Sequence, residues 1–195
     1  PVMPERSLTS VPTAVRDATP ADHPAIRDVL RAAYQQYDTV LPPGVFGTYL
    51  EDILDLDTRA RTGRLLVAER DGRIVGAVTF YEDAATEGFG WPSGWAGLRA
   101  LGVDPAARGQ GIGHQLMEAC LLGARRVGAE VLCLHSAAFM TDALAIYDAM
   151  GFVRVPEFDF EATALLQIGG AEPIKIIAFR LDFSNHRNTH TRSTP

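Results

Sequence analysis

The sequence predicts one domain of mixed α/β class, with a sheet flanked by helices on both faces. Three observations predict it. Apolar segments of strand length alternate along the chain with segments that carry apolar residues at helical spacing. The dipeptide Asp71-Gly72 joins two strand-like runs and is a strong hairpin signal. A glycine-rich turn over 108–113 separates an apolar run from a helical segment, which is typical of a strand–turn–helix unit.

Local start and stop signals place the individual elements. Thr19 followed by Pro20 opens a helix that runs to about Gln36. The Pro- and Gly-containing break at 41–44 separates it from a second helix. In chain order we expect strand 15–18, helix 19–36, helix 46–56, strands 64–69 and 73–81, a strand ending at 103, helix 111–127, strand 131–135, helix 141–150, and strands near 152–156 and 174–182.

Composition is that of an ordinary globular enzyme domain. The 195 residues are 47% apolar and 22% charged, which suits a single sizeable core. No apolar run approaches the roughly 18 residues of a membrane span, and the first residues lack the apolar core of a secretory signal. Cys120 and Cys133 lie in apolar segments, so we expect buried reduced thiols and a cytoplasmic protein. The net charge of −6 disfavours nucleic-acid binding through a basic field.

The two ends of the chain differ from the region between them. Residues 1–12 are rich in Pro, Ser and Thr and are expected to be flexible, and residues 184–195 contain no apolar side chain and are expected to be disordered. His186 and His190 in this tail have the spacing of metal ligands, but no third ligand accompanies them. We therefore expect a domain over 13–183 and no metal site.

The turn Arg108–Gly113 has the composition of an anion site. The first N–H groups of a helix have no internal partner, and the helix dipole adds partial positive charge there. Gly109, Gly111 and Gly113 lack the Cβ atoms that would keep a phosphate away from these amides. Arg108 adds a forked cation. The turn is predicted to hold a diphosphate.

Two common phosphate motifs do not fit this turn. A nucleotidase phosphate loop needs a lysine after its second glycine, and the only lysine of the chain is Lys175. A dinucleotide fingerprint is spaced Gly-x-Gly-x-x-Gly, whereas the glycines here are spaced Gly-x-Gly-x-Gly. Its ribose-binding acid would follow the next strand, but Glu130 precedes that strand.

The turn instead resembles the acetyl-CoA signature of the GNAT N-acetyltransferase superfamily, Arg/Gln-x-x-Gly-x-Gly/Ala. The segment 143–152, with Tyr147 before Gly151-Phe152, is similar to a second landmark of that family. The resemblance is strong over 96–155 and consistent in order over 13–183. It implies the GNAT acyl-CoA N-acyltransferase fold, with a mixed, mostly antiparallel central sheet flanked by helices on both faces. It also implies acetyl-CoA as cosubstrate and no metal.

The same resemblance implies the cofactor contacts and a catalytic acid. A local break after the fourth strand would let pantetheine lie along that strand's edge, with a backbone N–H near Leu101 binding the oxyanion. Tyr147 would protonate the departing thiolate, although it could be a packing tyrosine instead. The expected cofactor-binding residues are Leu101, Gly102, Val103, Arg108, Gly109, Gln110, Gly111, Ile112, Gly113 and His114.

The base and the acceptor remain open. Residues 96–103 contain no carboxylate, so Glu82 or His135 are considered as proton acceptors and neither is assigned. Family resemblance places the acceptor near Tyr34, Tyr37, Tyr49, Trp91, Trp95, Phe158 and Phe160, with Glu51, Asp52, Glu82 and Asp159 as amine partners. We expect a small amine, with a peptide N-terminus as the alternative. A non-catalytic acyl-CoA sensor is the second functional hypothesis, and a homodimer is left open.

Overall fold

The computed structural model describes residues 12–165 and 173–183. The expectations for the two ends of the chain, including His186 and His190, therefore fall almost entirely outside the described residues. Within them, no helix combines the length and the apolar character needed to cross a membrane.

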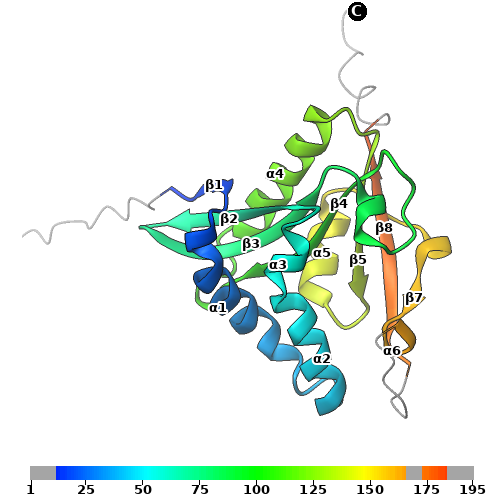
Figure 1. The fold of residues 1–195 in the computed structure, drawn as a ribbon, viewed down its shortest axis with the longest axis horizontal. Coiled ribbons are helices and arrows are strands. Elements are labelled where there is room, and N and C mark those ends of the chain that lie inside the picture. The colour runs from blue at the N-terminus through cyan, green and yellow to red at the C-terminus, as the bar shows by residue number, and fades with distance from the viewer. Residues whose placement is uncertain (1–11, 166–172, 184–195) are drawn as a thin grey trace, which may run out of the picture.

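The described residues form one eight-stranded sheet in the order β1-β2-β3-β4-β5-β8-β6, with β7 also on β8 (Figure 1). Among the described strands only β4 and β5 pair in parallel, because α4 carries the chain back between them. All other pairs are antiparallel. The strands are β1 (Ala14–Asp17), β2 (Arg64–Arg70), β3 (Arg73–Tyr81), β4 (Ala96–Val103), β5 (Val131–Ala137), β6 (Val153–Arg154), β7 (Phe160–Glu161) and β8 (Lys175–Asp182).

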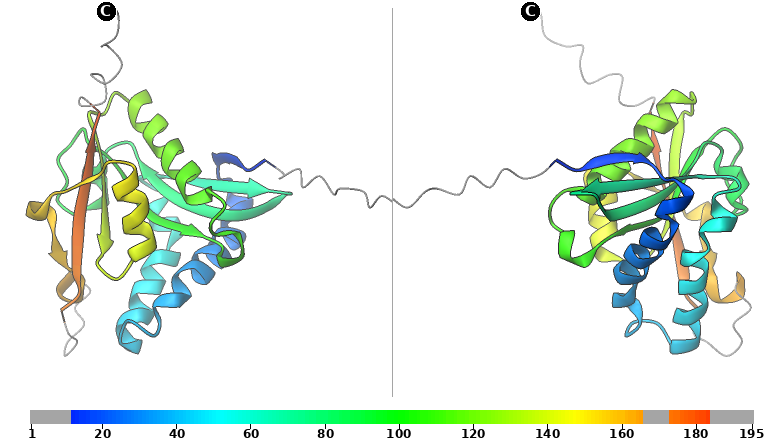
Figure 2. Two further views of the ribbon diagram at one scale, coloured as in Figure 1. Left: turned by 180° about the vertical axis from the view of Figure 1, so that it is seen from behind. Right: turned by 60° about the vertical axis from the view of Figure 1, so that its left-hand side comes forward.

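Helices cover both faces of the sheet, as Figure 2 shows from behind and from the side. Helices α1 to α3 lie on one face, and α4 and α5 lie on the other. The α-helices are α1 (His23–Tyr34), α2 (Pro43–Leu54), α3 (Leu56–Arg59), α4 (Ile112–Arg126), α5 (Thr141–Ala149) and α6 (Ala162–Leu165). Short 3-10 turns are η1 (Pro20–Asp22), η2 (Gln35–Tyr37), η3 (Ala84–Glu87), η4 (Pro105–Ala107) and η5 (Pro156–Phe158).

The second helix differs from its predicted range. It begins at Pro43 instead of Phe46, because proline fits the first helical position, where an N–H would have no partner. It ends at Leu54, and the side chain of Asp55 accepts a hydrogen bond from the Thr58 N–H at 3.0 Å to start a separate helix, α3. The strand predicted over 152–156 is reduced to β6, and the short elements η3 and β7 were not predicted.

The side chains of β2 and β3 alternate between two cores. Leu66 and Phe80 belong to the core under α4, whereas Leu65 and Val67 belong to the core under α1 to α3. Cys120 and Cys133 are buried free thiols, as expected.

Strands β4 and β5 separate part-way along their length. Their ladder ends at the pair Leu98 and Leu134, although both strands continue. On the other side of β4 the register with β3 changes, so that β4 carries one extra residue between Arg99 and Gly102. Ala100 in this bulge has φ of 54°, a conformation that side chains disfavour. The edge of β4 that faces β5 therefore has no strand partner beyond Leu98.

Candidate active site

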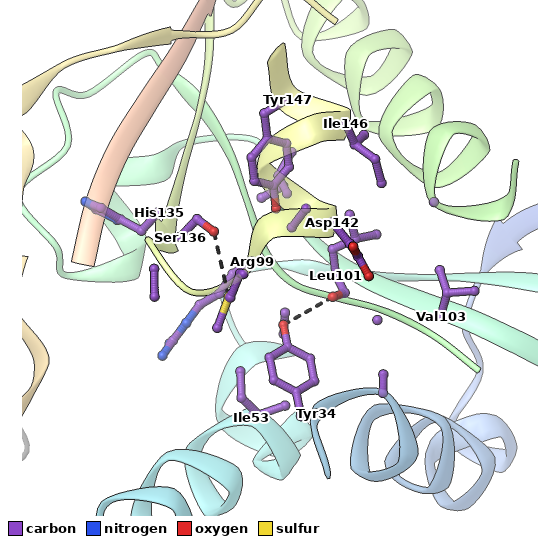
Figure 3. A pocket seen from close by; sticks show the side chains of 18 of the residues that line it. Tyr34, Ile53, Arg99, Leu101, Val103, His135, Ser136, Asp142, Ile146 and Tyr147 are labelled. Atoms are coloured by element: carbon purple, nitrogen blue, oxygen red, sulfur yellow. Dashed lines mark hydrogen bonds between the residues drawn. The ribbon is translucent and has the colours of Figure 1, made fainter. Parts of the chain in front are cut away.

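A cavity of about 520 Å³ opens where β4 and β5 separate (Figure 3). Its walls come from α1 and α2 on one face of the sheet and from the start of α4 and from α5 on the other. This volume is within the range of small-molecule sites. Of the predicted site residues, those that line it are Leu101, Gly102, Val103, Arg108, Gly109, Gly111, Ile112, Gly113, His114 and Tyr147.

The glycine-rich turn presents an open surface at the N-terminus of α4. Gly109 and Gly111 have φ of 71° and 77°, a conformation that favours glycine, and no atom lies within 4 Å of where their Cβ atoms would be. Glycine is favoured at position 113 for a different reason, since an added Cβ would lie only 3.2 Å from Cδ1 of Ile146 on α5. The turn thus combines accessible backbone with the positive end of a 15-residue helix.

Arg108 contacts α1 in addition to lining the cavity. Its Nη2 donates to the carbonyl oxygen of Ala33 at 3.0 Å and its Nη1 to Oε1 of Gln36 at 3.1 Å. These two donors tie the turn to the C-terminal end of α1 and to η2. Gln110 does not line the cavity, because its side chain accepts a hydrogen bond from Arg70.

Tyr147 lies on the face of α5 that is turned to the sheet, as its helical spacing predicts. The residue is 5% exposed, and its ring centroid lies 5.9 Å from those of Phe152 and Phe179. The hydroxyl points into the cavity (Figure 3). Burial raises the pKa of Tyr147 well above its ordinary value, so the phenol keeps its proton.

An ion pair between α2 and β4 lines the wall of the cavity opposite α5. Asp52 of α2 binds Nη2 of Arg99 on β4, and the Arg99 guanidinium carbon lies 4.7 Å from the Phe89 ring centroid. Buried Arg59 supports Asp52 from behind, since its Nη1 donates to the Asp52 carbonyl oxygen at 2.8 Å and its Nε to Oγ1 of Thr79 at 3.0 Å. Carbonyl groups at a helix end need such partners, so Arg59 fixes the end of α2.

Neither proton acceptor considered from the sequence fits that role. Glu82 is exposed, lies 3.7 Å from Arg64 and does not line the cavity. His135 lines it, but its Nε2 bonds the carbonyl oxygen of Phe158 at 2.9 Å and therefore carries the proton. Burial lowers the pKa of His135 to about 4, so the ring is neutral and weakly basic at neutral pH.

The acceptor residues expected from the sequence divide into two groups. One group lines the cavity and consists of Tyr34, Tyr37, Tyr49, Asp52 and Phe160. The other does not and consists of Glu51, Glu82, Trp91, Trp95, Phe158 and Asp159. Trp91 and Phe158 instead pack in a third apolar cluster against β5 and β8. Asp159 is held by Arg154 at 2.9 Å and Lys175 at 3.1 Å.

Comparison with known proteins places this geometry in a family. The model of the acetyltransferase (GNAT) family matches residues 24–152, a range that includes the glycine-rich turn, the separation of β4 from β5, and Tyr147. The match covers well over half of the chain. The chain belongs to the acetyltransferase (GNAT) family.

Individual GNAT relatives and structures are similar to different extents. The chain is 36% identical over 101 residues to an IAA acetyltransferase of Azospirillum brasilense, which covers 51% of this chain and 61% of that relative. It therefore spans less than two thirds of that relative's length. The structure of PaiA N-acetyltransferase from Thermoplasma acidophilum in complex with coenzyme A has a TM-score of 0.67 at 13% identity, over 88% of this chain and 99% of that one. A GNAT family acetyltransferase from Brucella melitensis in complex with acetyl-CoA has a TM-score of 0.52 at 27% identity, over 73% and 83%.

The GNAT fold expected from the sequence is confirmed. The sheet is mixed and mostly antiparallel, and helices flank both faces. Within residues 12–165 and 173–183, no group of three His, Cys, Asp or Glu side chains is arranged to hold a metal ion.

Some residues that line the cavity were not predicted from the sequence. Glu87 and Phe89 line it from the connection between β3 and β4, Ser136 lines it from the C-terminal end of β5, and Asp142 lines it from the first turn of α5. The segment 82–95 shows no helical or strand periodicity, so no sequence signal indicated that Glu87 turns inward.

Proposed function

We propose that this protein is an acetyl-CoA-dependent N-acetyltransferase that moves an acetyl group to a primary amine of a small-molecule acceptor. The observation that carries the proposal is one cavity that joins the glycine-rich turn, the unpaired edge of β4 and the hydroxyl of Tyr147. The turn would bind the diphosphate, the edge of β4 would bind the pantetheine thioester, and the hydroxyl would protonate the leaving thiolate. The acetyl-CoA complex of the 27% identical Brucella protein supports the choice of cosubstrate.

The diphosphate is assigned to the turn. Its oxygens would accept hydrogen bonds from backbone N–H groups of Gly109, Gly111, Ile112 and Gly113, where the dipole of α4 is positive. Gln110 and His114 lie beside it. The contacts of Arg108 with α1 hold the turn in place and bring a positive charge near it.

Pantetheine is assigned to the edge of β4. The amides of pantetheine would pair with the strand from Leu101 to Val103, which lacks a partner on the β5 side. This contact uses the backbone, so the side chains of the same residues remain free to pack. The bulge at Ala100 turns the backbone at Leu101, where a backbone N–H is proposed to bind the oxyanion.

The proposed reaction is a direct transfer. The neutral amine nitrogen forms a bond to the thioester carbonyl carbon and gives one proton to water, and the carbon–sulfur bond then breaks. The thiolate takes the hydroxyl proton of Tyr147, which solvent restores after release. Burial raises the pKa of the Tyr147 phenol and would raise that of the thiol as well. Desolvation therefore does not by itself oppose the transfer of the proton from one to the other.

The acceptor is assigned to the aromatic end of the cavity. Tyr34, Tyr37, Tyr49, Phe89 and Phe160 line this end, and aromatic faces attract cations and rings. The cavity of about 520 Å³ must also hold part of the cosubstrate, which favours a small acceptor. We propose that the unit which performs the transfer spans residues 13–183.

Turnover of acetyl-CoA with pooled primary amines tests the proposal, with release of free thiol and the mass of acetylated amine as readouts. We expect thiol release that depends on the amine pool. Binding of acetyl-CoA without any acetylated amine would indicate the acyl-CoA sensor instead.

A further inference from the structure

Glu87 carries a carboxyl group that has no role in the acetyl transfer proposed above. It is the last residue of η3 and lines the cavity. Its Oε1 is shielded from solvent and has no hydrogen-bond partner among the described residues. It packs directly against β4, since a Cβ on Gly97 would lie 2.5 Å from this oxygen. Gly97 precedes Leu98, the last residue of β4 that is paired with β5.

The charges around Glu87 leave it uncompensated. Arg99 is the cation that acts on its charge, but the Arg99 guanidinium is already paired with Asp52. The other titratable groups that Glu87 influences are Tyr81 on β3 and Cys133 on β5, and burial raises the pKa of both, which keeps them neutral. The acceptor end of the cavity thus holds one carboxyl more than its cations balance.

A structural role explains this arrangement poorly. A buried carboxyl without a hydrogen bond is costly, and packing against Gly97 would be served as well by an apolar side chain. A buried polar atom without a partner needs an explanation, and a ligand in the adjoining cavity provides one. An ammonium group has three N–H donors and the opposite charge.

We propose that Glu87 binds the ammonium group of the acceptor and takes one of its protons before acetyl transfer. This inference rests on the proposed function. The proton moves from nitrogen to a carboxylate oxygen of Glu87, which leaves a neutral amine with a lone pair and a neutral carboxylic acid. The amine then attacks the thioester, and of its two remaining protons one stays on the amide and the other passes to water as the carbon–sulfur bond breaks. Glu87 returns its proton to solvent when the product departs.

The acid–base properties of the site agree with this role. Burial raises the pKa of Glu87 from 4.5 to about 8, and Arg99 opposes the shift. A carboxylate in such a site is a much stronger base than an exposed one. His135 and Tyr147 face the same cavity but are neutral, so neither competes for the proton.

The isosteric variant Glu87→Gln tests the proposal, with Glu82→Gln as the matched control. Glu82 lies five residues earlier in the same connection, exposed and outside the cavity. With the best acceptor of the amine pool, we expect Glu87→Gln to lower kcat/KM about 100-fold, the scale of general-base catalysis, without change in acetyl-CoA affinity. The wild type should show a rise of kcat/KM through about pH 8, and this rise should be absent in Glu87→Gln. Glu82→Gln should match the wild type. Wild-type kcat/KM in Glu87→Gln would overturn the proposal.

Gly97→Ala provides a second variant that keeps the carboxylate and moves it. The added Cβ would lie 2.5 Å from Oε1 of Glu87 and 2.9 Å from Cβ of Ala84, so the Glu87 side chain must shift. We expect a loss of kcat/KM with acetyl-CoA affinity retained. Unaltered kcat/KM in this variant would contradict the contact on which the proposal depends.

A measurement without turnover separates this inference from the proposed function. The carboxyl carbon signal of Glu87 is identified by its absence in Glu87→Gln and followed by NMR at pH 7 while pooled primary amines are added. We expect it to move toward the ionised position, because without a thioester to attack the bound amine remains an ammonium group, which stabilises the carboxylate. A signal that stays in place would overturn the role of Glu87, whether or not the wild type acetylates an amine. Absence of any acetylated amine, with the signal moving, would count against the proposed function alone.

Discussion

The hydroxyl of Tyr34 on α1 donates a hydrogen bond to the carbonyl oxygen of Leu101 on β4 at 3.1 Å (Figure 3). Leu101 follows Ala100, whose positive φ costs a non-glycine residue about 1–2 kcal/mol. Strained backbone of this kind persists where its surroundings hold it. The contact therefore lets α1 stabilise the bulge that exposes the edge of β4 to the cavity.

Replacing Tyr34 by Phe tests this contact. We expect Tyr34→Phe to lower the free energy of unfolding by about 1 kcal/mol, the net value of one hydrogen bond. Turnover should also fall, because the backbone near Leu101 is held less firmly. Urea denaturation measures the first effect. Tyr37→Phe is the control, since Tyr37 also lies in the α1–η2 region and lines the cavity. Equal stability of the two variants would contradict the inferred role of Tyr34.

The anion site of the turn is tested by Gly111→Glu. A negative side chain placed among the α4 amides should raise the Kd for acetyl-CoA by at least about 100-fold, because like charges brought together cost several kcal/mol. Gly128→Glu is a matched control at the other end of α4, with a similar φ of 74° and equally open space. Calorimetry measures both affinities. Unchanged affinity in Gly111→Glu would refute the cosubstrate site.

The role of Tyr147 as an acid is tested by Tyr147→Phe. Removing the hydroxyl should lower kcat by about 100-fold and leave the Kd for acetyl-CoA within about twofold, since the ring still packs against Phe152 and Phe179. Steady-state kinetics and calorimetry separate the two effects. A wild-type kcat would leave Tyr147 with a packing role only.

Binding of the cosubstrate should stabilise the fold. At about 100 times its Kd, coenzyme A should add about 2.7 kcal/mol to the free energy of unfolding, because it binds the folded state alone. For a chain of this length that corresponds to a rise in Tm of about 5–10 °C. A thermal melt with and without coenzyme A measures it. No rise at saturating concentration would count against both the transferase and the sensor.

The buried carboxyl of Glu87 also predicts how stability depends on pH. Its pKa is raised from 4.5 to about 8 in the folded protein, so between these values the folded state binds more protons than the unfolded state. Its contribution to stability is therefore complete below about pH 4.5 and is lost as the pH rises through about 8. We expect the Tm of the wild type to fall more than that of Glu87→Gln between pH 5.5 and pH 8. Parallel curves would show that Glu87 is not buried as described.

The sequence by itself determined the local features of this protein. Apolar periodicity predicted most of the helices and strands, because spacing along the chain fixes which face each element buries. Gly109 and Gly111 predicted an open turn before α4, since the absence of a Cβ atom is a property of the residue type. The helical position of Tyr147 predicted that its ring would face inward.

The tertiary structure alone decided which distant groups meet. Arg108 turns to Ala33 on α1, and Glu87 turns against Gly97 on β4, although nothing near either residue in the chain indicates it. Trp91 and Phe158, equally plausible as cavity residues, pack elsewhere. Loops have no periodicity, so their side chains are placed by contacts with residues far away in the sequence. The turn proposed to bind the cosubstrate could therefore be predicted from the sequence, whereas the carboxyl proposed to receive the amine could be found only in the assembled tertiary structure.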